Sequence, residues 1–363
     1  MLSNNITVLK KVVFSDSDGN STDITQLCSD IIIEESLFNM YMTGFVSITD
    51  VSSFIEKINN DKDKFLTINI FNGMTKYEQS LTFQIHAITD FNKINDSKFE
   101  YKINFCSSEF FIQSKMRISK GLSGTKVAIL SNILSPITKK KLLMKNDNKN
   151  GVLLSPRLKP FDLIDLLLLY DKNSSDYVFW ENFRGFNCNS VTSMLQRKTS
   201  FNFYETQINA LDDSQIIKED VENNHHIIKS YKIPSFFNKI IDVDEGVSGA
   251  TLISYDYLKG TPTEYYINKD YKKQKIYIHE DNNLNYTNYL QRHSILTQLL
   301  NNEWFILVNG NYTNSTGDCV HVRLLQSNNN PGYSQTISGN YIITSIKHMI
   351  NKNSYIQEIG ISH

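Results

Sequence analysis

The stretch KFEYKINF, residues 98–105, alternates apolar with charged or polar side chains along its whole length. A period of two places every second side chain on the same face of a β-strand, so this stretch predicts an antiparallel strand with one buried face and one wet face. Two earlier runs, residues 66–70 and 81–87, alternate in the same way, and polar turns such as FNKINDS separate the runs. Several strands at this spacing predict a small β-barrel or sandwich in the first third of the chain.

The pattern changes after residue 107, where an α+β part is expected. The segment SGTKVAILSNIL, from Ser123, begins with an N-cap residue and keeps its apolar side chains on one helical face. KPFDLIDLLLLYD offers Pro160 for a first helical position. DYVFWENFRGFNCNS predicts a β-hairpin whose turn contains Gly185, a residue that can adopt a positive φ.

The last part of the chain returns to β structure after one more helix. NYTNYLQRHSILTQLLNNE predicts that helix, with apolar contacts from Leu290, Ile295, Leu299 and Leu300. The runs WFILVNG, CVHVRLL, NYIITSIKHM and YIQEIGIS follow it and are typical of strands.

These later strands repeat the first third of the chain at an offset of roughly 255 positions, with a drift of about one residue per loop. The repeat predicts two copies of one β-domain, and chance similarity between alternating runs is the competing explanation. The proposed correspondences are Leu66, Ile68 and Ile70 with Val320, Val322 and Leu324; Ile88 and Thr89 with Ile343 and Thr344; and Phe99, Ile103 and Phe105 with Tyr355, Ile359 and Ile361.

The fold class that these patterns predict is mainly β with α+β parts. It contains two related small antiparallel β-barrels, an α+β domain between them and an insertion in the second barrel. The expected boundaries are 1–107 for the first barrel, 108–202 for the α+β domain, 203–240 and 301–363 for the split second barrel, and 241–300 for the insertion, which ends in a helix.

The composition is that of an ordinary globular protein. The chain is 40% hydrophobic and 21% charged, a balance that excludes a disordered chain. Its 363 residues are more than one hydrophobic core usually serves. Lys and Arg total 37 against 38 for Asp and Glu, and the absence of a basic stripe argues against nucleic acid as the main ligand. No apolar run is long enough for a signal peptide or a membrane span. The cysteines lack CxxC spacing and are expected to be structural thiols in a reducing compartment: Cys28, Cys106, Cys188 and Cys319.

Three groups of residues imitate chemical sites, and each has a simpler interpretation. SKGLSGTK lacks the glycine spacing and the Lys-Ser or Lys-Thr pair of a phosphate-binding loop. The adjacent His225 and His226 would point to opposite faces of a strand, so they do not match the spacing of zinc ligands. Asp162 and Asp165 lie three apart on an apolar helix and are expected to form its solvent stripe rather than a glycosidase pair. We therefore expect no catalytic residue, no metal and no cofactor.

An apolar cluster stands out in ESLFNMYMTGFVSITD, residues 35–50, because it falls on a turn or strand end. Connections usually face water, so a cluster of this kind is a candidate contact surface. Gly44 would let the chain re-enter a sheet beside a packed neighbour. The alternative is that these side chains plug the end of the first barrel.

Three segments of the chain resemble the baseplate hub protein of contractile-tailed bacteriophages, a family that also includes the hub portion of type VI secretion spike proteins. They are DIIIEESLFNMYMTGFVSITDVSSF, the hairpin DYVFWENFRGFNCNS and SGNYIITSIKHMINKNSYIQEIGIS. The resemblance implies a homotrimer in which each subunit contributes two similar barrels, so that threefold symmetry imitates sixfold symmetry. It also implies that the apolar cluster lies at a subunit or partner interface through Leu37, Phe38, Tyr41, Met42 and Phe45.

The function implied by the resemblance is that of a structural hub ring, which adapts a trimeric central spike to a hexameric tail tube. The expected partners are the spike protein, the tail tube protein, other baseplate proteins and DNA in transient passage, with no small-molecule substrate and no stable membrane insertion. The location implied is the tail baseplate of a virion that assembles in the host cytoplasm. Host and particle type stay open.

Two other functions stay open at this level. The first is a receptor- or glycan-binding tail protein that uses the aromatic side chains of Tyr255, Tyr257, Tyr265 and Tyr266, although aromatics serve β cores and interfaces equally well. The second, less favoured, is a cell-wall-degrading enzyme. A glycan-binding screen and a zymogram would separate them from a structural hub.

Overall fold

The computed structural model describes most of the chain, and it confirms a mainly β fold with α+β parts. The described residues are 7–58, 62–72, 77–95, 98–145, 149–170, 176–205, 225–234, 250–256, 260–266, 274–279, 286–326, 333–352 and 354–363.

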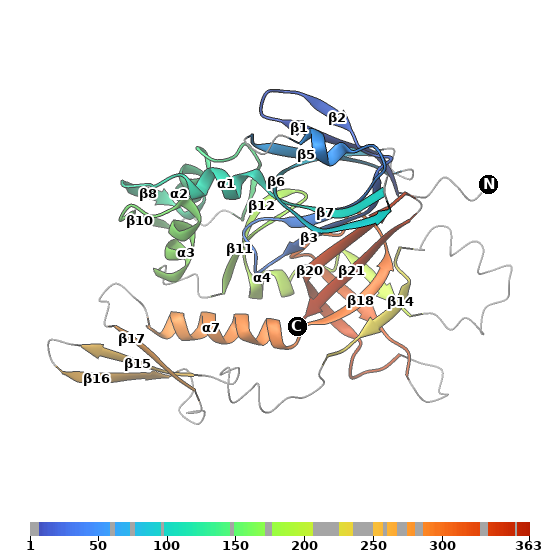
Figure 1. Cartoon of the computed structure of the whole chain (residues 1–363). Helices are drawn as coiled ribbons and strands as arrows, with labels where there is room; N and C mark the ends of the chain where they lie inside the picture. Colours follow the sequence, from blue (N-terminus) through green and yellow to red (C-terminus); the bar gives the residue numbers. More distant parts are fainter. Residues whose placement is uncertain are drawn as a thin grey trace.

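A 13-stranded sheet contains strands from both ends of the chain (Figure 1). The strands of its first half are β1 (Thr7–Asp16), β2 (Ser21–Asp23), β3 (Cys28–Ser36), β4 (Thr43–Asp50), β5 (Lys64–Asn72), β6 (Tyr77–Asn95) and β7 (Lys98–Cys106). Those of its second half are β13 (Phe201–Tyr204), β14 (Ile228–Lys232), β18 (Trp304–Asn309), β19 (Cys319–Arg323), β20 (Gly339–Asn351) and β21 (Tyr355–Ser362).

The two halves have the same strand order. In the first half the order is β3-β4-β7-β6-β5-β1, and in the second it is β14-β18-β21-β20-β19-β13. The equivalent strands also follow one another in the same sequence along the chain. One pairing differs, because β1 is antiparallel to β5 whereas β13 is parallel to β19. Two halves that agree in this way are what a duplicated β-domain predicts.

The pairing registers agree residue by residue. The pairing of β5 with β6 begins at Gln84, and the pairing of β19 with β20 begins at Ile342. Leu66 and Val320 each follow the first paired residue of their own strand by one position, so they are equivalent. A β-bulge follows Ile85 in β6 and Ile343 in β20, and another follows Cys28 in β3 and Ile228 in β14. Bulges are designed features of a sheet, so their recurrence at equivalent positions supports the repeat.

The predicted correspondences hold for two of the three segments. The register confirms the segments around residues 66–70 and 99–105, but it shifts the third. Ile88 pairs with Ile103, and Ile346 pairs with Ile359, so Ile88 is equivalent to Ile346 and not to Ile343.

The halves are joined by an antiparallel pairing of β3 with β20, from Asp30–Asn351 to Ser36–Ser345. The named strands among the described residues form no closed barrel, and both halves belong to one continuous sheet. In the second half, an isolated bridge between Tyr204 and Ile227 brings β13 beside the start of β14. Each half covers its own core, one around Ile31, Ile68 and Ile103 and the other around Ile306, Val322 and Ile359.

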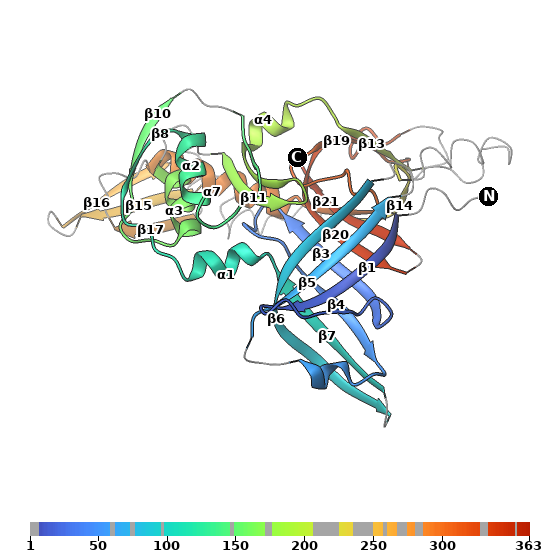
Figure 2. The same cartoon turned by 90° about the horizontal axis from the view of Figure 1, so that it is seen from above.

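One predicted turn is a strand. FNKIN, the first five residues of the segment FNKINDS, forms the end of the 19-residue strand β6. Every residue from Thr89 to Asn95 is exposed, so this part of β6 has no buried face that a period of two could reveal. β6 and β7 project from the sheet toward the lower edge of Figure 2.

The middle part has four helices and two small sheets, and its core is centred on Ile129, Leu163 and Phe186. Its elements are α1 (Ser108–Ser114), β8 (Gly121–Thr125), α2 (Lys126–Leu134), β9 (Leu142–Leu143), β10 (Asn150–Leu154), α3 (Pro160–Tyr170), β11 (Tyr177–Asn182), β12 (Gly185–Ser190) and α4 (Val191–Leu195).

The hairpin β11–β12 and helix α3 are where the sequence predicts them, but the predicted start of α2 is wrong. The N-cap of α2 is Thr125, whose side chain accepts a hydrogen bond from the Ala128 amide, because Ser123 is used in the pairing of β8 with β10. Asp162 and Asp165 are both exposed, as a solvent stripe requires. Gly185 has φ 128° in the turn of the hairpin β11–β12.

The region before β18 holds β15 (Ala250–Asp256), β16 (Thr261–Tyr266), β17 (Gln274–His279) and α7 (Tyr286–Asn301). Figure 1 shows the small sheet of these strands beside α7. Leu290 and Leu299 are buried as predicted, whereas Leu300 is exposed. The side chain of Arg292 donates to the Tyr177 carbonyl and ties α7 to the hairpin. Among the described residues, no helix combines the length and apolar character that crossing a bilayer requires.

Candidate functional site: the joint between the two halves of the sheet

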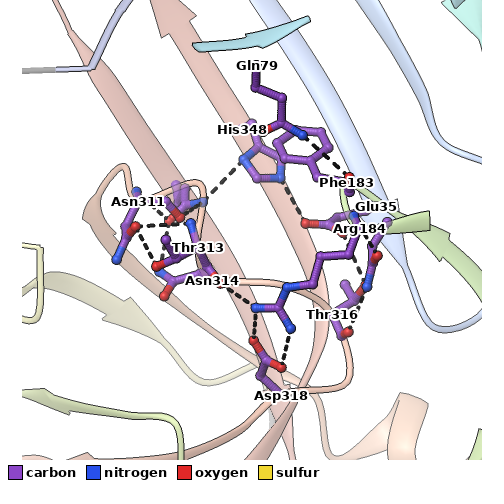
Figure 3. Close-up of polar contacts among 12 residues, drawn as sticks. Glu35, Gln79, Phe183, Arg184, Asn311, Thr313, Asn314, Thr316, Asp318 and His348 are labelled. Atoms are coloured by element: carbon purple, nitrogen blue, oxygen red, sulfur yellow. Dashed lines mark hydrogen bonds and ion pairs between the residues drawn. The ribbon is translucent and has the colours of Figure 1, made fainter. Parts of the chain in front are cut away.

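The joint is the pairing of β3 with β20, together with the polar side chains packed against it. At its centre, Glu35 Oε1 lies 3.0 Å from Nε2 of His348, and both side chains are fully buried (Figure 3). The other carboxylate oxygen of Glu35 accepts a hydrogen bond from the Thr316 hydroxyl at 3.2 Å. A carboxylate in a protein interior is costly unless such partners surround it, so this contact fixes how the strands meet.

The imidazole of His348 extends the network into the second half. Its Nδ1 lies 2.7 Å from the Tyr355 hydroxyl, and Gln357 Nε2 donates to that hydroxyl at 2.9 Å. Burial raises the pKa of Tyr355 well above its usual value, and the neighbouring Glu35 adds to this effect. The phenol is therefore neutral at any physiological pH, and it acts as a hydrogen-bonding group rather than a base.

The hairpin β11–β12 packs against the side of the joint. Phe183, in its turn, stacks on the His348 ring with the ring centroids 4.3 Å apart. Arg184 forms a two-pronged ion pair with Asp318, at 2.9 and 2.8 Å, in the loop that also carries Thr316 (Figure 3). Bidentate pairs of this kind fix orientation as well as contributing energy. The two halves and the middle part therefore meet at one place.

A second charged cluster, whose two carboxylates are buried, anchors the apolar stretch at residues 35–50. Lys140 Nζ lies 2.9 Å from Glu109 Oε2 and 2.5 Å from Glu181 Oε1, and Glu181 also accepts from the Met42 amide at 3.1 Å. Burial raises the pKa of Glu181, and Lys140 opposes that rise. Burial lowers the pKa of Lys140, but its two carboxylate partners outweigh this and raise it.

The predicted interface residues separate into two groups. Leu37 and Met42 are 2% and 3% exposed in the single chain. Leu37 packs against Trp180 and Leu299, in the cluster where the sheet, the hairpin and α7 meet. The expectation that they lie at a subunit or partner interface is corrected for these two side chains, because Leu37 is covered by the hairpin, α7 and β20, and Met42 belongs to the core of the first half.

The other three residues are half-buried. Tyr41 packs against Phe110, with the ring centroids 4.5 Å apart, and Lys102 lies over the Phe45 ring. Phe38 packs at the edge of the Leu37 cluster. Contact of Phe38, Tyr41 and Phe45 with another subunit stays a prediction.

Gly44 has the close neighbours that its position in the sequence predicted. A Cβ at this residue would lie 2.2 Å from the Ile32 carbonyl oxygen and 2.7 Å from the Phe105 ring. We expect Gly44→Ala to lower the free energy of unfolding by about 2 kcal/mol, because β3 or Phe105 must move. Urea unfolding would measure the loss. Gly151→Ala is the matched control, since its Cβ meets nothing within 4 Å; equal losses in both variants would contradict the steric explanation.

The four cysteines are buried, and none is in a disulfide. Burial raises the pKa of Cys28 to about 12 and that of Cys106 to about 11. Only the thiolate is nucleophilic, so at pH 8 about one Cys28 in ten thousand is reactive even before access is considered. We expect the thiols of the native protein not to react with Ellman's reagent for minutes, and all four to react once the protein is unfolded in urea. A native thiol that reacts within seconds would contradict this.

No chemical site emerges from the residues that imitate one. Among the described residues, no group of three or more His, Cys, Asp or Glu could hold a metal ion. His225 and His226 lie beside each other, and burial lowers the pKa of both. Tyr255 is exposed, Tyr265 stacks on Tyr286, and Tyr257 lies outside the described residues. What the geometry supports is a rigid joint that sets the relative orientation of two similar β units.

Solved structures of tail proteins share this fold. The tail protein from Neisseria meningitidis MC58 matches 97% of this chain over 96% of its own length, with a TM-score of 0.59 at 11% identity. The 43 kDa tail protein of prophage MuSo2 from Shewanella oneidensis matches 97% of this chain over 98% of its own, with a TM-score of 0.61 at 12% identity. A chain of the Francisella PdpA-VgrG complex matches 99% of this chain over 59% of its own, with a TM-score of 0.50 at 8% identity. No protein-family model and no curated protein matches the sequence. The chain thus has the fold of these tail proteins.

Proposed function

We propose that this protein is a structural baseplate hub subunit of a phage tail. The observation that carries the proposal is the internal duplication: two β units with the same strand order, joined through a buried and fully partnered polar contact. The likeness in fold to two phage tail proteins over nearly the whole chain supports it.

A duplicated unit gives a trimer six similar surfaces. In this proposal residues 1–107 form one unit, and residues 203–240 with 301–363 form the other, with 108–202 between them and 241–300 inserted. Three copies in a ring would present three of each unit, so that a threefold particle resembles a sixfold one. Such a ring can seat a trimeric spike on one side and a hexameric tube on the other.

The partners in this proposal are the central spike protein, the tail tube protein and other baseplate proteins. DNA would pass through the ring, and a net charge of −1 suits a passage that does not hold its cargo. The role is structural rather than catalytic. The protein would assemble in the host cytoplasm and end in the tail baseplate of the virion.

Native mass measurement is the first test of the proposal. We expect a species of three times the 41.9 kDa chain at micromolar concentration, with more than about 1,200 Å² buried per contact. A stable monomer, together with no trimer in particles imaged by cryo-EM, would overturn the proposal. Strong retention on a bacterial glycan array by the monomer would favour a receptor-binding role instead.

A further inference from the structure

We propose that, in the ring, the free edge of β6 in one copy pairs antiparallel with β14 of the next copy, in the way that β20 pairs with β3 inside the chain. This inference rests on the proposed trimeric hub and names the contact that would build it. It follows from comparing what the equivalent strands of the two halves do.

The long strands β20 and β6 differ in what covers their second edge. β20 pairs with β21 on one edge; its other edge pairs first with β19 and then, from Ser345 to Asn351, with β3. β6 pairs with β7 on one edge and first with β5 on the other, up to Gln84. Among the described residues, no strand occupies the position on β6 that β3 occupies on β20.

The unoccupied part of β6 is exposed and carries apolar side chains. Phe91 and Ile94 are each 52% exposed, on the segment from Thr89 to Asn95. A strand edge offers unsatisfied backbone donors and acceptors, and soluble proteins rarely leave a long edge with apolar residues uncovered. This edge therefore has the character of a surface that another strand covers.

The complementary edge belongs to β14. It is the equivalent of β3, as the shared bulge and strand order indicate. β3 lies between β4 and β20, whereas β14 pairs with β18 and no other named strand among the described residues. The side chains from Lys229 to Lys232 are exposed, and Tyr231 is 41% exposed.

The register of the proposed contact can be derived. Asn92 pairs with Glu100 as Met349 pairs with Ile356, so Asn92 is equivalent to Met349. Lys232 pairs with Phe305 as Ile32 pairs with Phe45, so Lys232 is equivalent to Ile32. Met349 and Ile32 are opposite each other in the joint. Asn92 of one copy is therefore opposite Lys232 of the next.

The contact is heterologous, because different strands of the two copies meet. Repetition of one heterologous contact gives a ring when the rotation closes, and a filament when it does not. If the contact between copies repeats the joint inside the chain, six similar joints alternate around a trimer. Main-chain hydrogen bonds of an added strand would supply affinity, as in other strand-addition complexes.

Cysteine cross-linking tests the register. Opposite residues of antiparallel strands have Cα atoms about 4.5–5.5 Å apart, within reach of a disulfide. We expect Asn92→Cys chains mixed with tagged Lys232→Cys chains to form a covalent heterodimer under mild oxidation. The native cysteines are buried and leave the background low. Lys10→Cys replaces Lys232→Cys as the control, since Lys10 is exposed on a different strand.

The outcomes separate this inference from the proposed function. If the unmodified protein is a trimer but the Asn92→Cys and Lys232→Cys chains form no cross-link, or cross-link no better than the Lys10→Cys control, the strand pairing is overturned and the proposed hub function still stands. Absence of any trimer overturns both. As a second measurement, we expect Ile94→Asp to weaken trimer formation about tenfold or more, as loss of an interface anchor does. Val152→Asp, at a side chain that is 78% exposed on β10, should leave it unchanged, and equal effects would contradict the proposal.

Discussion

Replacing Leu37 with alanine is expected to lower the free energy of unfolding of the single chain by about 3 kcal/mol. The side chain is 2% exposed, and it fills the space among Trp180, Leu299 and Ile342, where three parts of the chain meet. Removing it leaves a cavity between elements that cannot easily close, because the Leu37 amide is held by the Thr344 carbonyl at 2.8 Å. Urea unfolding of dilute, monomeric protein measures the loss.

Phe38→Ala is the matched comparison for Leu37→Ala. Phe38 is the next residue, and it is half-buried at the edge of the same cluster. We expect a smaller loss of monomer stability, and a weaker trimer if Phe38 contacts a neighbouring subunit. If Leu37→Ala lowers the free energy of unfolding of the monomer by less than about 1 kcal/mol, Leu37 is not buried by folding, since replacing a core leucine with alanine usually costs about 2–5 kcal/mol.

Replacing Glu35 with alanine is expected to cost about 3 kcal/mol and to loosen the joint specifically. The substitution removes the partner of His348 Nε2 and of the Thr316 hydroxyl, both in the protein interior. Without the carboxylate, Glu35 of β3 no longer links to His348 of β20, so this part of the strand pairing should open more often. Amide hydrogen exchange should therefore rise between Ser345 and Asn351, the part of β20 that pairs with β3.

Two variants make the Glu35 result specific. Glu35→Gln keeps the shape of the side chain and one hydrogen-bond acceptor, so it should lower the free energy of unfolding less than Glu35→Ala does. Glu34→Ala removes a neighbouring carboxylate that is half-exposed and lies 3.9 Å from Lys347, and exposed pairs contribute little. If Glu35→Ala and Glu34→Ala cost the same, the buried contact does not stabilise the joint.

Errors in the sequence-based prediction have identifiable causes. FNKIN was expected to be a turn, but an exposed strand end lacks the buried face that creates alternation. The N-cap of α2 lies at Thr125 rather than Ser123, because pairing with β10 extends β8 through the predicted first turn. The equivalence of Ile88 was misplaced by three residues because the second copy has a longer connection before its long strand. Cys319 pairs with Ile342, 23 positions on, whereas Phe65 pairs with Gln84, 19 positions on, so the offset grows by four where a drift of about one was assumed.

The sequence by itself determined much of the local structure of this protein: that the alternating stretches are strands, which face of each is buried, and that the β pattern occurs twice. Those properties depend on side chains a few positions apart. Only the tertiary structure decided that β3 pairs with β20, that Glu35 meets His348 across 313 positions, and that folding rather than assembly buries Leu37. Alternation says which face of a strand is apolar and not which strand lies beside it, so partners that are distant in the chain leave no local signal.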